Sequence, residues 1–148
     1  MNLFIGVIYA VNSITQFAAM QLVERFRSRY LITVGLVLSS LVFLLFTRAT
    51  SFWEIIPLEV ILATAWACLY IGSVNYVLTS GKERGTSAGL LQSSISISAI
   101  MGSMVGGAIT FAFGYHGSML VAAGLAILAI AIFLAGDSWR SKRSATPI

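Results

Sequence analysis

The stretch YLITVGLVLSSLVFLLFT, residues Tyr30–Thr47, contains no charged residue and no Asn or Gln. A helix needs about 20 largely apolar residues to cross a bilayer, because its internal hydrogen bonds must satisfy every backbone polar group there. Arginines flank the stretch, Arg29 before it and Arg48 after it. The stretch therefore predicts a membrane-spanning helix, and we expect an all-α membrane protein around it.

The chain has four further apolar segments, one before this stretch and three after it, and short polar connections separate them. The five expected spans are Leu3–Val23, Tyr30–Thr47, Ile55–Thr79, Thr86–Ala112 and Ser118–Gly136. The composition agrees, since 58% of the 148 residues are hydrophobic and only 9% are charged, against roughly 25% charged in a soluble domain. We expect one membrane domain over residues 1–136 and a polar, basic, disordered tail over residues 137–148.

Basic residues alternate between the two sides of the membrane that these spans define. The first connection has Arg25, Arg27 and Arg29, the second has Arg48, the third has Lys82 and Arg84, and the tail has Arg140, Lys142 and Arg143. Eight of the nine basic residues thus fall on one side, which the positive-inside rule places in the cytoplasm. The sequence predicts an external N-terminus and a cytoplasmic C-terminus, in the cytoplasmic membrane of a prokaryote. The net charge of +4 is explained by topology, and no nucleic-acid partner is expected.

Polar side chains inside the spans predict which helices face protein or water, because such groups are costly in hydrocarbon. The first span has Asn12, Gln16 and Gln21, the third has Glu59 and Asn75, and the fourth has Gln92. The second and fifth spans have no Asn, Gln or charged residue. They are therefore expected to be the lipid-facing pair.

The third span has two different faces. Glu59, Trp66, Tyr70 and Ser73 are separated by seven, four and three residues, which places them on one face of a helix. Glu59, Trp66 and Tyr70 are candidates for the wall of a substrate cavity, and Asn12, Gln16 and Gln92 are further candidates on other spans. The alternative is that Glu59 only reaches lipid headgroups or pairs with Arg48. The opposite face has small residues suited to close helix contact, namely Thr64, Cys68, Gly72 and Asn75, and Cys68 is interpreted as a packing residue.

The fourth span has a stripe of small residues at intervals of four, formed by Ser94, Ser98, Gly102, Gly106 and Thr110. Such stripes let helix backbones approach closely in lipid, where packing drives association. We interpret it as a helix-packing groove. Gln92 and Ser96 lie one turn apart, and either a substrate or a neighbouring helix is an equally good partner for them.

Two segments resemble those of a known family. The first connection, Met20-Gln-Leu-Val-Glu-Arg-Phe-Arg-Ser-Arg29, resembles the loop signature Gly-x-Leu-x-Asp-Arg-x-Gly-Arg-Arg of the major facilitator superfamily. Leu22, Glu24, Arg25 and Arg29 match it, whereas Met20 and Arg27 replace its glycines and Ser28 replaces an arginine. The stretch Glu83-Arg-Gly-Thr-Ser-Ala-Gly-Leu-Leu-Gln92 and the glycine-dotted helix after it resemble the penultimate helix of that family.

The resemblance implies a partial six-helix half of the family fold. Family transporters have twelve helices with both termini in the cytoplasm, and each half is built from two inverted three-helix repeats. The five spans would then be the last five, and the third would correspond to the cavity-lining tenth helix. The resemblance also implies that Glu24, Arg25 and Arg29 form a conformational latch between helix ends. The alternative is that the arginines only fix the topology.

The expected function is that of a secondary transporter fragment, which moves a small solute by alternating access with binding near the midplane. If transport is coupled to protons, Glu59 is the one carboxylate inside a span that is available to carry them. A membrane enzyme is disfavoured because the single histidine, His116, lies in an external connection. A small structural or assembly subunit, or an oligomeric mini-transporter, is the alternative. No cofactor or metal motif is present. The expected partners are the lipid bilayer, the small solute, and either the missing N-terminal helices or another copy.

Overall fold

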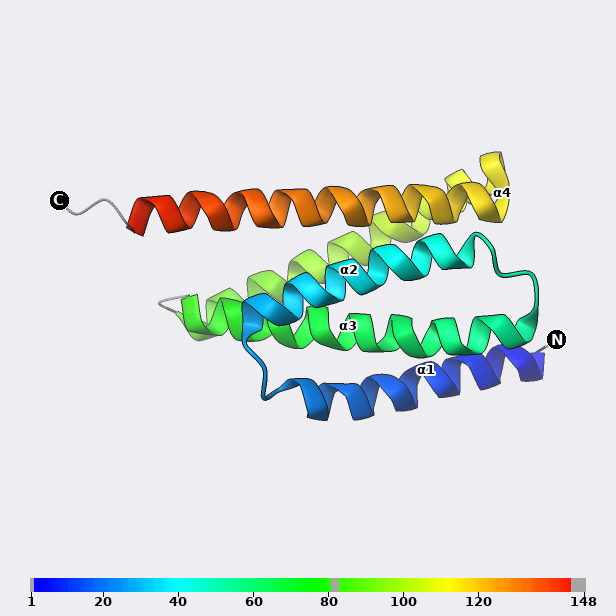
Figure 1. Ribbon diagram of the computed structural model, residues 1–148, viewed down its shortest axis with the longest axis horizontal. Helices are drawn as coiled ribbons and strands as arrows, with labels where there is room; N and C mark the ends of the chain where they lie inside the picture. The colour runs from blue at the N-terminus through cyan, green and yellow to red at the C-terminus, as the bar shows by residue number, and fades with distance from the viewer. Residues whose placement is uncertain (1, 81–82, 145–148) are drawn as a thin grey trace.

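The computed structural model describes residues 2–80 and 83–144, and these residues are helical apart from short connections (Figure 1). The helices are α1 (Asn2–Val23), α2 (Ser28–Phe46), α3 (Phe52–Ser80) and α4 (Arg84–Ser144). Each is long and apolar enough to cross a membrane. The all-helical fold class is therefore confirmed, and the first three helices agree with the expected spans to within a few residues.

The last two expected spans are joined in α4, which is broken at Gly114. This glycine has φ 70° and ψ −177°, a backbone region that is essentially closed to side-chain-bearing residues. The chain reverses there, so residues 84–113 and 115–144 form two arms that run in opposite directions (Figure 1). We call them the first and second arms of α4. Near the break, the hydroxyl of Thr110 lies 2.9 Å from that of Ser118 and joins the two arms.

The helix ends are fixed by local hydrogen bonds. The carboxylate of Glu54 accepts hydrogen bonds from the backbone N–H groups of Thr50 at 2.9 Å and Ser51 at 3.3 Å. This satisfies backbone donors just before α3, as a capping residue in the first turn does. At the end of α2, the Thr47 hydroxyl donates to the carbonyl of Leu44 at 2.6 Å. The short polar segment between α2 and α3 therefore ends one helix and begins the next without a long loop.

Helix α3 is the centre of the bundle and packs against α1, α2 and α4. Its contact with α2 is close because glycines face the partner helix on both sides. A Cβ atom built on Gly35 would lie 2.9 Å from the backbone oxygen of Ala65, and one built on Gly72 would lie 3.0 Å from that of Ser28. Cys68 is buried with Val23 and Leu31, in agreement with its predicted packing role. The small-residue face of the third span therefore packs on α2.

The prediction that the second span faces lipid is wrong for much of its surface. Of the α2 span, 39% of residues are buried, against 6% for α1 and 6% for α4. Helix α2 packs on both α3 and α4, and it buries Gly35, Ser39 and Ser40. The prediction counted only Asn, Gln and charged residues, whereas small residues are what allow a helix to pack closely in a membrane.

The C-terminal segment also differs from the expectation. Helix α4 continues to Ser144, well beyond the expected end at Gly136, so the first part of the expected disordered tail is helical. Residues 145–148 lie outside the described part of the chain.

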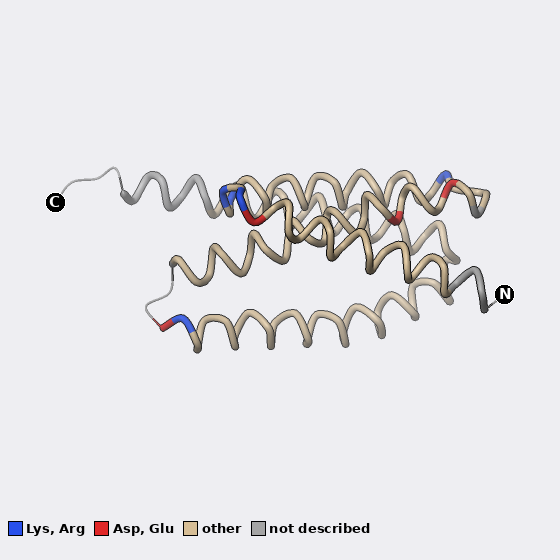
Figure 2. Tube along the Cα trace, turned by 90° about the horizontal axis from the view of Figure 1, so that it is seen from below, with Lys and Arg blue, Asp and Glu red and all other residues tan. Residues whose placement is uncertain are grey.

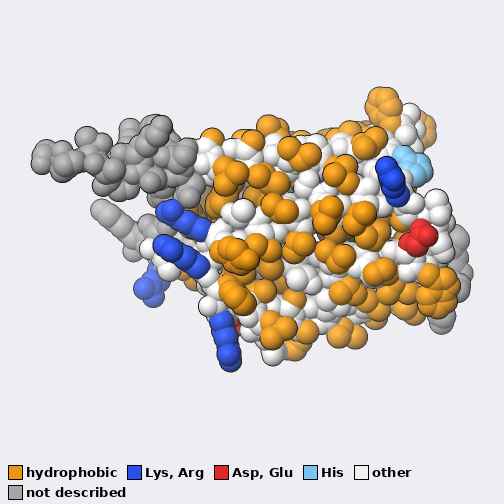
Figure 3. All heavy atoms as spheres, in the orientation of Figure 1, with side chains coloured by type: hydrophobic (Ala, Val, Ile, Leu, Met, Phe, Trp, Pro, Cys, Tyr) orange, Lys and Arg blue, Asp and Glu red, His pale blue; other side chains and the backbone are white. Residues whose placement is uncertain are grey.

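Apart from Glu59 within α3, the charged residues of the described chain gather near the two ends of the bundle, and the face seen in Figure 3 is largely apolar between them (Figures 2 and 3). Arg25, Arg27, Arg29 and Arg84 lie at the end where α1 meets α2 and α3 meets α4. Arg48 lies at the opposite end, between α2 and α3. This separation is the arrangement expected for a protein whose apolar middle is surrounded by lipid.

Candidate functional site

A hydrogen bond between α1 and α3 engages the carboxylate inside the bundle. The side-chain amide of Asn12 donates to Oε2 of Glu59 at 2.8 Å, and both residues are partly buried. Among the described residues, Asn12 is thus a hydrogen-bond partner of Glu59. Two polar residues that the sequence placed on separate spans are thus in direct contact.

The contact between Asn12 and Glu59 has a signal in the sequence, namely the matching depth of two polar residues on parallel helices. Helices α1 and α3 are separated by one antiparallel helix, so they run in the same direction (Figure 1). Asn12 and Glu59 both lie in the N-terminal halves of their helices, at comparable depth. A carboxylate inside a span requires a polar partner, and Asn12 is such a residue. Gln16 lies one turn further along α1 and is also partly buried.

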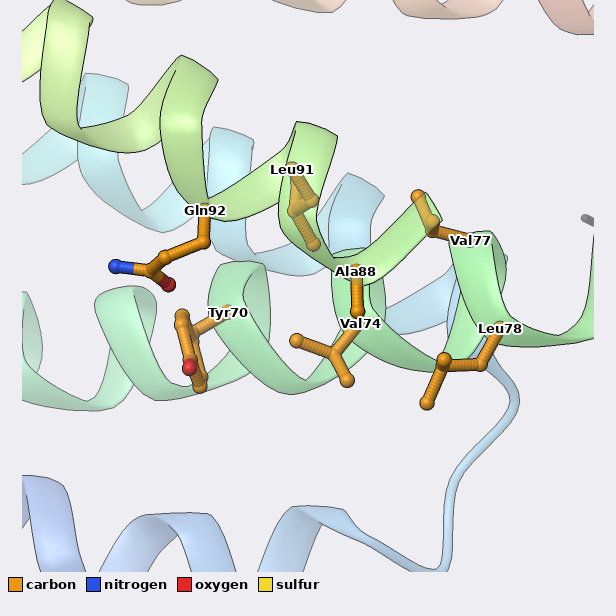
Figure 4. A pocket seen from close by; sticks show the side chains of 7 residues that line it. All are labelled: Tyr70, Val74, Val77, Leu78, Ala88, Leu91 and Gln92. Atoms are coloured by element: carbon orange, nitrogen blue, oxygen red, sulfur yellow. The ribbon is translucent and has the colours of Figure 1, made fainter. Parts of the chain in front are cut away.

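The aromatic part of the stripe on α3 faces the first arm of α4. Trp66, Tyr70 and Ser73 line a cavity of about 140 Å³ together with Leu69, Leu91 and Ile95. A second cavity of about 240 Å³ is lined from α3 by Tyr70, Val74, Val77 and Leu78, and from α4 by Ala88, Leu91 and Gln92. Figure 4 shows the Tyr70 ring and the Gln92 amide projecting into the same space from the two helices. The structure thus brings three of the candidate cavity residues together, namely Trp66, Tyr70 and Gln92.

A third cavity continues this surface toward the Gly114 end of the first arm. It measures about 490 Å³ and is lined by Trp66, Ser94, Ile95, Ser98 and Ala99. None of the three cavities is lined by Glu59. The stripe on α3 is therefore divided between two neighbours: Glu59 bonds to α1, and the aromatic residues face α4.

The small-residue stripe on the first arm is open for most of its length. A Cβ atom built on Gly102 or Gly106 would meet no atom within 4 Å, so no described helix packs there. The Ser94 hydroxyl donates to the carbonyl of Leu90 at 2.9 Å, and that of Thr110 to the carbonyl of Gly106 at 2.7 Å. These hydroxyls are satisfied within their own helix. Ser96 is exposed on the same arm. That this stripe packs against another helix therefore stays a prediction. The helix that would pack there lies outside the described residues.

Of the predicted latch residues, Glu24 and Arg25 lie in the connection between α1 and α2, and Arg29 lies in the first turn of α2. All three are exposed. The turn is closed by a hydrogen bond from the backbone N–H of Phe26 to the carbonyl of Val23 at 3.1 Å. Val23 itself is buried in the cluster with Leu31 and Cys68. The connection is thus tied to α3 through Val23, while its charged residues are exposed.

Among the described residues, no group of three or more His, Cys, Asp or Glu side chains is placed to hold a metal ion. The site is instead a set of amide, hydroxyl and aromatic groups in an apolar bundle.

Comparison with known proteins identifies one family. The family model of the Major Facilitator Superfamily matches residues 1–147 of the chain. No curated protein and no solved structure matches it.

Proposed function

The chain belongs to the major facilitator superfamily, and we propose from this premise that it forms five spans of a secondary transporter for a small solute. Members of this family are transporters rather than enzymes, and the apolar helices agree with an integral membrane location. The observation that carries the proposal is the set of cavities between α3 and α4, whose apolar walls also hold aromatic and neutral polar side chains. Such a lining is characteristic of substrate sites near the bilayer midplane in secondary transporters.

The candidate residues have distinct roles in this proposal. Trp66, Tyr70 and Gln92 line the solute site between α3 and α4. Asn12 and Gln16 form the polar face of α1, where the Asn12 amide orients the Glu59 carboxylate. Glu59 carries the proton if transport is proton-coupled. Glu24, Arg25 and Arg29 act as the latch that stabilises one of the two access states.

We further propose five membrane crossings, with the N-terminus outside and the C-terminus in the cytoplasm. The break at Gly114 divides α4 into two arms that are each long enough to cross a bilayer. Arg25, Arg27, Arg29 and Arg84 lie at one end of the bundle and Arg48 at the other, which favours the first end as the cytoplasmic one.

Reporter fusions test this orientation. A reporter that is active only in the cytoplasm should be active when fused after Lys82 or after Ile148, and inactive when fused after Tyr115. A fusion after Thr50 is a matched control and should also be inactive. Cytoplasmic activity at Tyr115 would contradict both the five crossings and the role of Gly114 as an external reversal.

A transport pathway in this family lies between two six-helix halves, so we expect the five spans to act together with further helices. The outer faces of α1 and α4 support this, since only 6% of the residues in each span are buried. Either additional helices of the same transporter or another copy of the chain would cover them.

Uptake assays test the proposed function. Residues 1–148 alone should give no uptake above empty liposomes across a panel of small solutes. Supplied with the further helices of a complete family fold, the protein should take up at least one solute, and Trp66→Ala should abolish this uptake. Ser93→Ala, which changes a residue outside the three cavities, is the control. Robust uptake by the chain alone would favour an oligomeric mini-transporter, and lack of uptake by both proteins would contradict a transport function.

A further inference from the structure

The three cavities between α3 and the first arm of α4 form one continuous groove. The cavity of about 240 Å³ shares Tyr70 and Leu91 with the cavity of about 140 Å³. The latter shares Trp66 and Ile95 with the cavity of about 490 Å³. Volumes of this order suit one small organic molecule rather than an ion or a polymer segment. The groove is therefore treated as one site, which we call the α3–α4 groove.

The lining of the α3–α4 groove is mostly apolar and uncharged. No Asp, Glu, Lys, Arg or His is among the described residues that line it. Trp66 and Tyr70 lie one turn apart on α3 and present two rings to the groove, and the side chain of Trp66 is 46% exposed. An aromatic ring offers a flat apolar surface on which an aromatic ligand stacks.

The polar groups that remain available in the groove are neutral. The side-chain amide of Gln92 makes no hydrogen bond to another described residue, and Figure 4 shows it over the same space as Tyr70. An amide offers two N–H donors and a carbonyl acceptor. The Ser94 hydroxyl already donates to the Leu90 carbonyl. Tyr70, Ser73 and Ser98 add hydroxyls to the lining. Gln92 is the group best equipped to orient a ligand, because an amide offers more hydrogen-bonding positions than a hydroxyl.

Glu59, the carboxylate that lies inside a described span, is not available to the groove. Glu59 accepts a hydrogen bond from Asn12 on α1 and lines none of the three cavities. A charged ligand in the groove would lose its hydration without gaining a counter-charge, which is strongly unfavourable in a low-dielectric environment. A neutral ligand with one hydrogen-bonding group avoids this penalty.

We propose that the α3–α4 groove selects an uncharged solute with a flat apolar body and a single hydrogen-bonding group. The body stacks on Trp66 and Tyr70, and the polar group bonds to the Gln92 amide. This inference rests on the proposed function and adds the chemical class of the solute.

Quenching of Trp66 fluorescence tests the selectivity at equilibrium, without transport. The full chain is placed in lipid nanodiscs with Trp53→Phe and Trp139→Phe, so that Trp66 is the only fluorophore of its type. The probes are para-nitrobenzyl alcohol, para-nitrobenzoate and para-nitrobenzylammonium, which share a ring and differ in charge. We expect saturable quenching by the alcohol, with an affinity at least about tenfold above that of either charged probe. The control is a variant in which Trp53 is the single tryptophan. Quenching of Trp53 measures the non-specific partition of the probes into lipid.

Changes at Gln92 sharpen the test. Gln92→Glu should reverse the preference, so that the ammonium probe binds about tenfold more tightly than the alcohol. Ser93→Glu adds the same charge one residue away, at a position that lines none of the three cavities, and should leave the preference unchanged. Gln92→Leu keeps the groove apolar and should weaken binding of the alcohol while leaving that of para-nitrotoluene unaltered.

Three outcomes would overturn the inference: equal or tighter binding of a charged probe to the unchanged groove, no saturable quenching by any probe, or identical effects of Gln92→Glu and Ser93→Glu. These outcomes are separate from failure of the proposed function. A chain that binds the neutral probe selectively but never supports uptake would contradict transport alone.

Discussion

Replacing Gly35 with valine should separate α2 from α3 and strongly destabilise the bundle. A Cβ atom at this position would lie 2.7 Å from the Leu69 side chain, 2.9 Å from the backbone oxygen of Ala65 and 3.0 Å from the backbone nitrogen of Leu69. A side chain could rotate away, but the two backbone atoms cannot. Because helix α3 would have to move, we expect a loss of about 1–3 kcal/mol or more in the free energy of unfolding.

The measurement is unfolding in mixed micelles with increasing sodium dodecyl sulfate, followed by helical circular dichroism. Gly124→Val is the matched control, because Gly124 also lies in a helix and a Cβ atom there would meet no atom within 4 Å. Both changes add the same β-branched side chain, so the difference between them isolates the contact. Equal unfolding midpoints for the two variants would show that α2 and α3 do not pack through Gly35.

Replacing Asn12 with leucine should leave the Glu59 carboxylate without its hydrogen bond inside the bundle. The present contact, with Nδ2 of Asn12 at 2.8 Å from Oε2 of Glu59, joins α1 to α3. A fully buried carboxylate that loses its donor destabilises a protein by about 2–3 kcal/mol, which is the upper bound for the partly buried Glu59. The effect on α1 should be large, since few other residues of this helix are buried.

The double variant Asn12→Leu, Glu59→Leu tests whether the loss of stability comes from the carboxylate that is left without a donor. It removes both polar groups, so it should be more stable than Asn12→Leu alone in the same unfolding assay. Asn75→Leu is the control, since the Asn75 side chain on α3 makes no hydrogen bond to another described residue. If Asn12→Leu and Asn75→Leu shift the unfolding midpoint equally, Asn12 does not stabilise the carboxylate.

Much of the candidate site could be predicted from residue spacing on single helices. The spacing of Trp66, Tyr70 and Ser73 placed them on one face, and the structure places them along one cavity. The spacing also placed Glu59 on that face, but this residue bonds to α1 instead. Helical periodicity gives the direction of a side chain around the axis of its helix. It does not tell which neighbouring helix that side chain contacts.

The sequence by itself determined the fold class, the approximate ends of the helices and the separation of charge between the ends of the bundle. These features depend on short-range properties, namely the length of apolar runs and the polar residues that interrupt them. Only the tertiary structure decided that α2 is the most buried span, that Asn12 pairs with Glu59, and that Gln92 shares a cavity with Tyr70. The physical reason is that packing in lipid is not driven by hydrophobicity, so a helix's neighbours depend on where small residues such as Gly35 and Gly72 allow two backbones to approach.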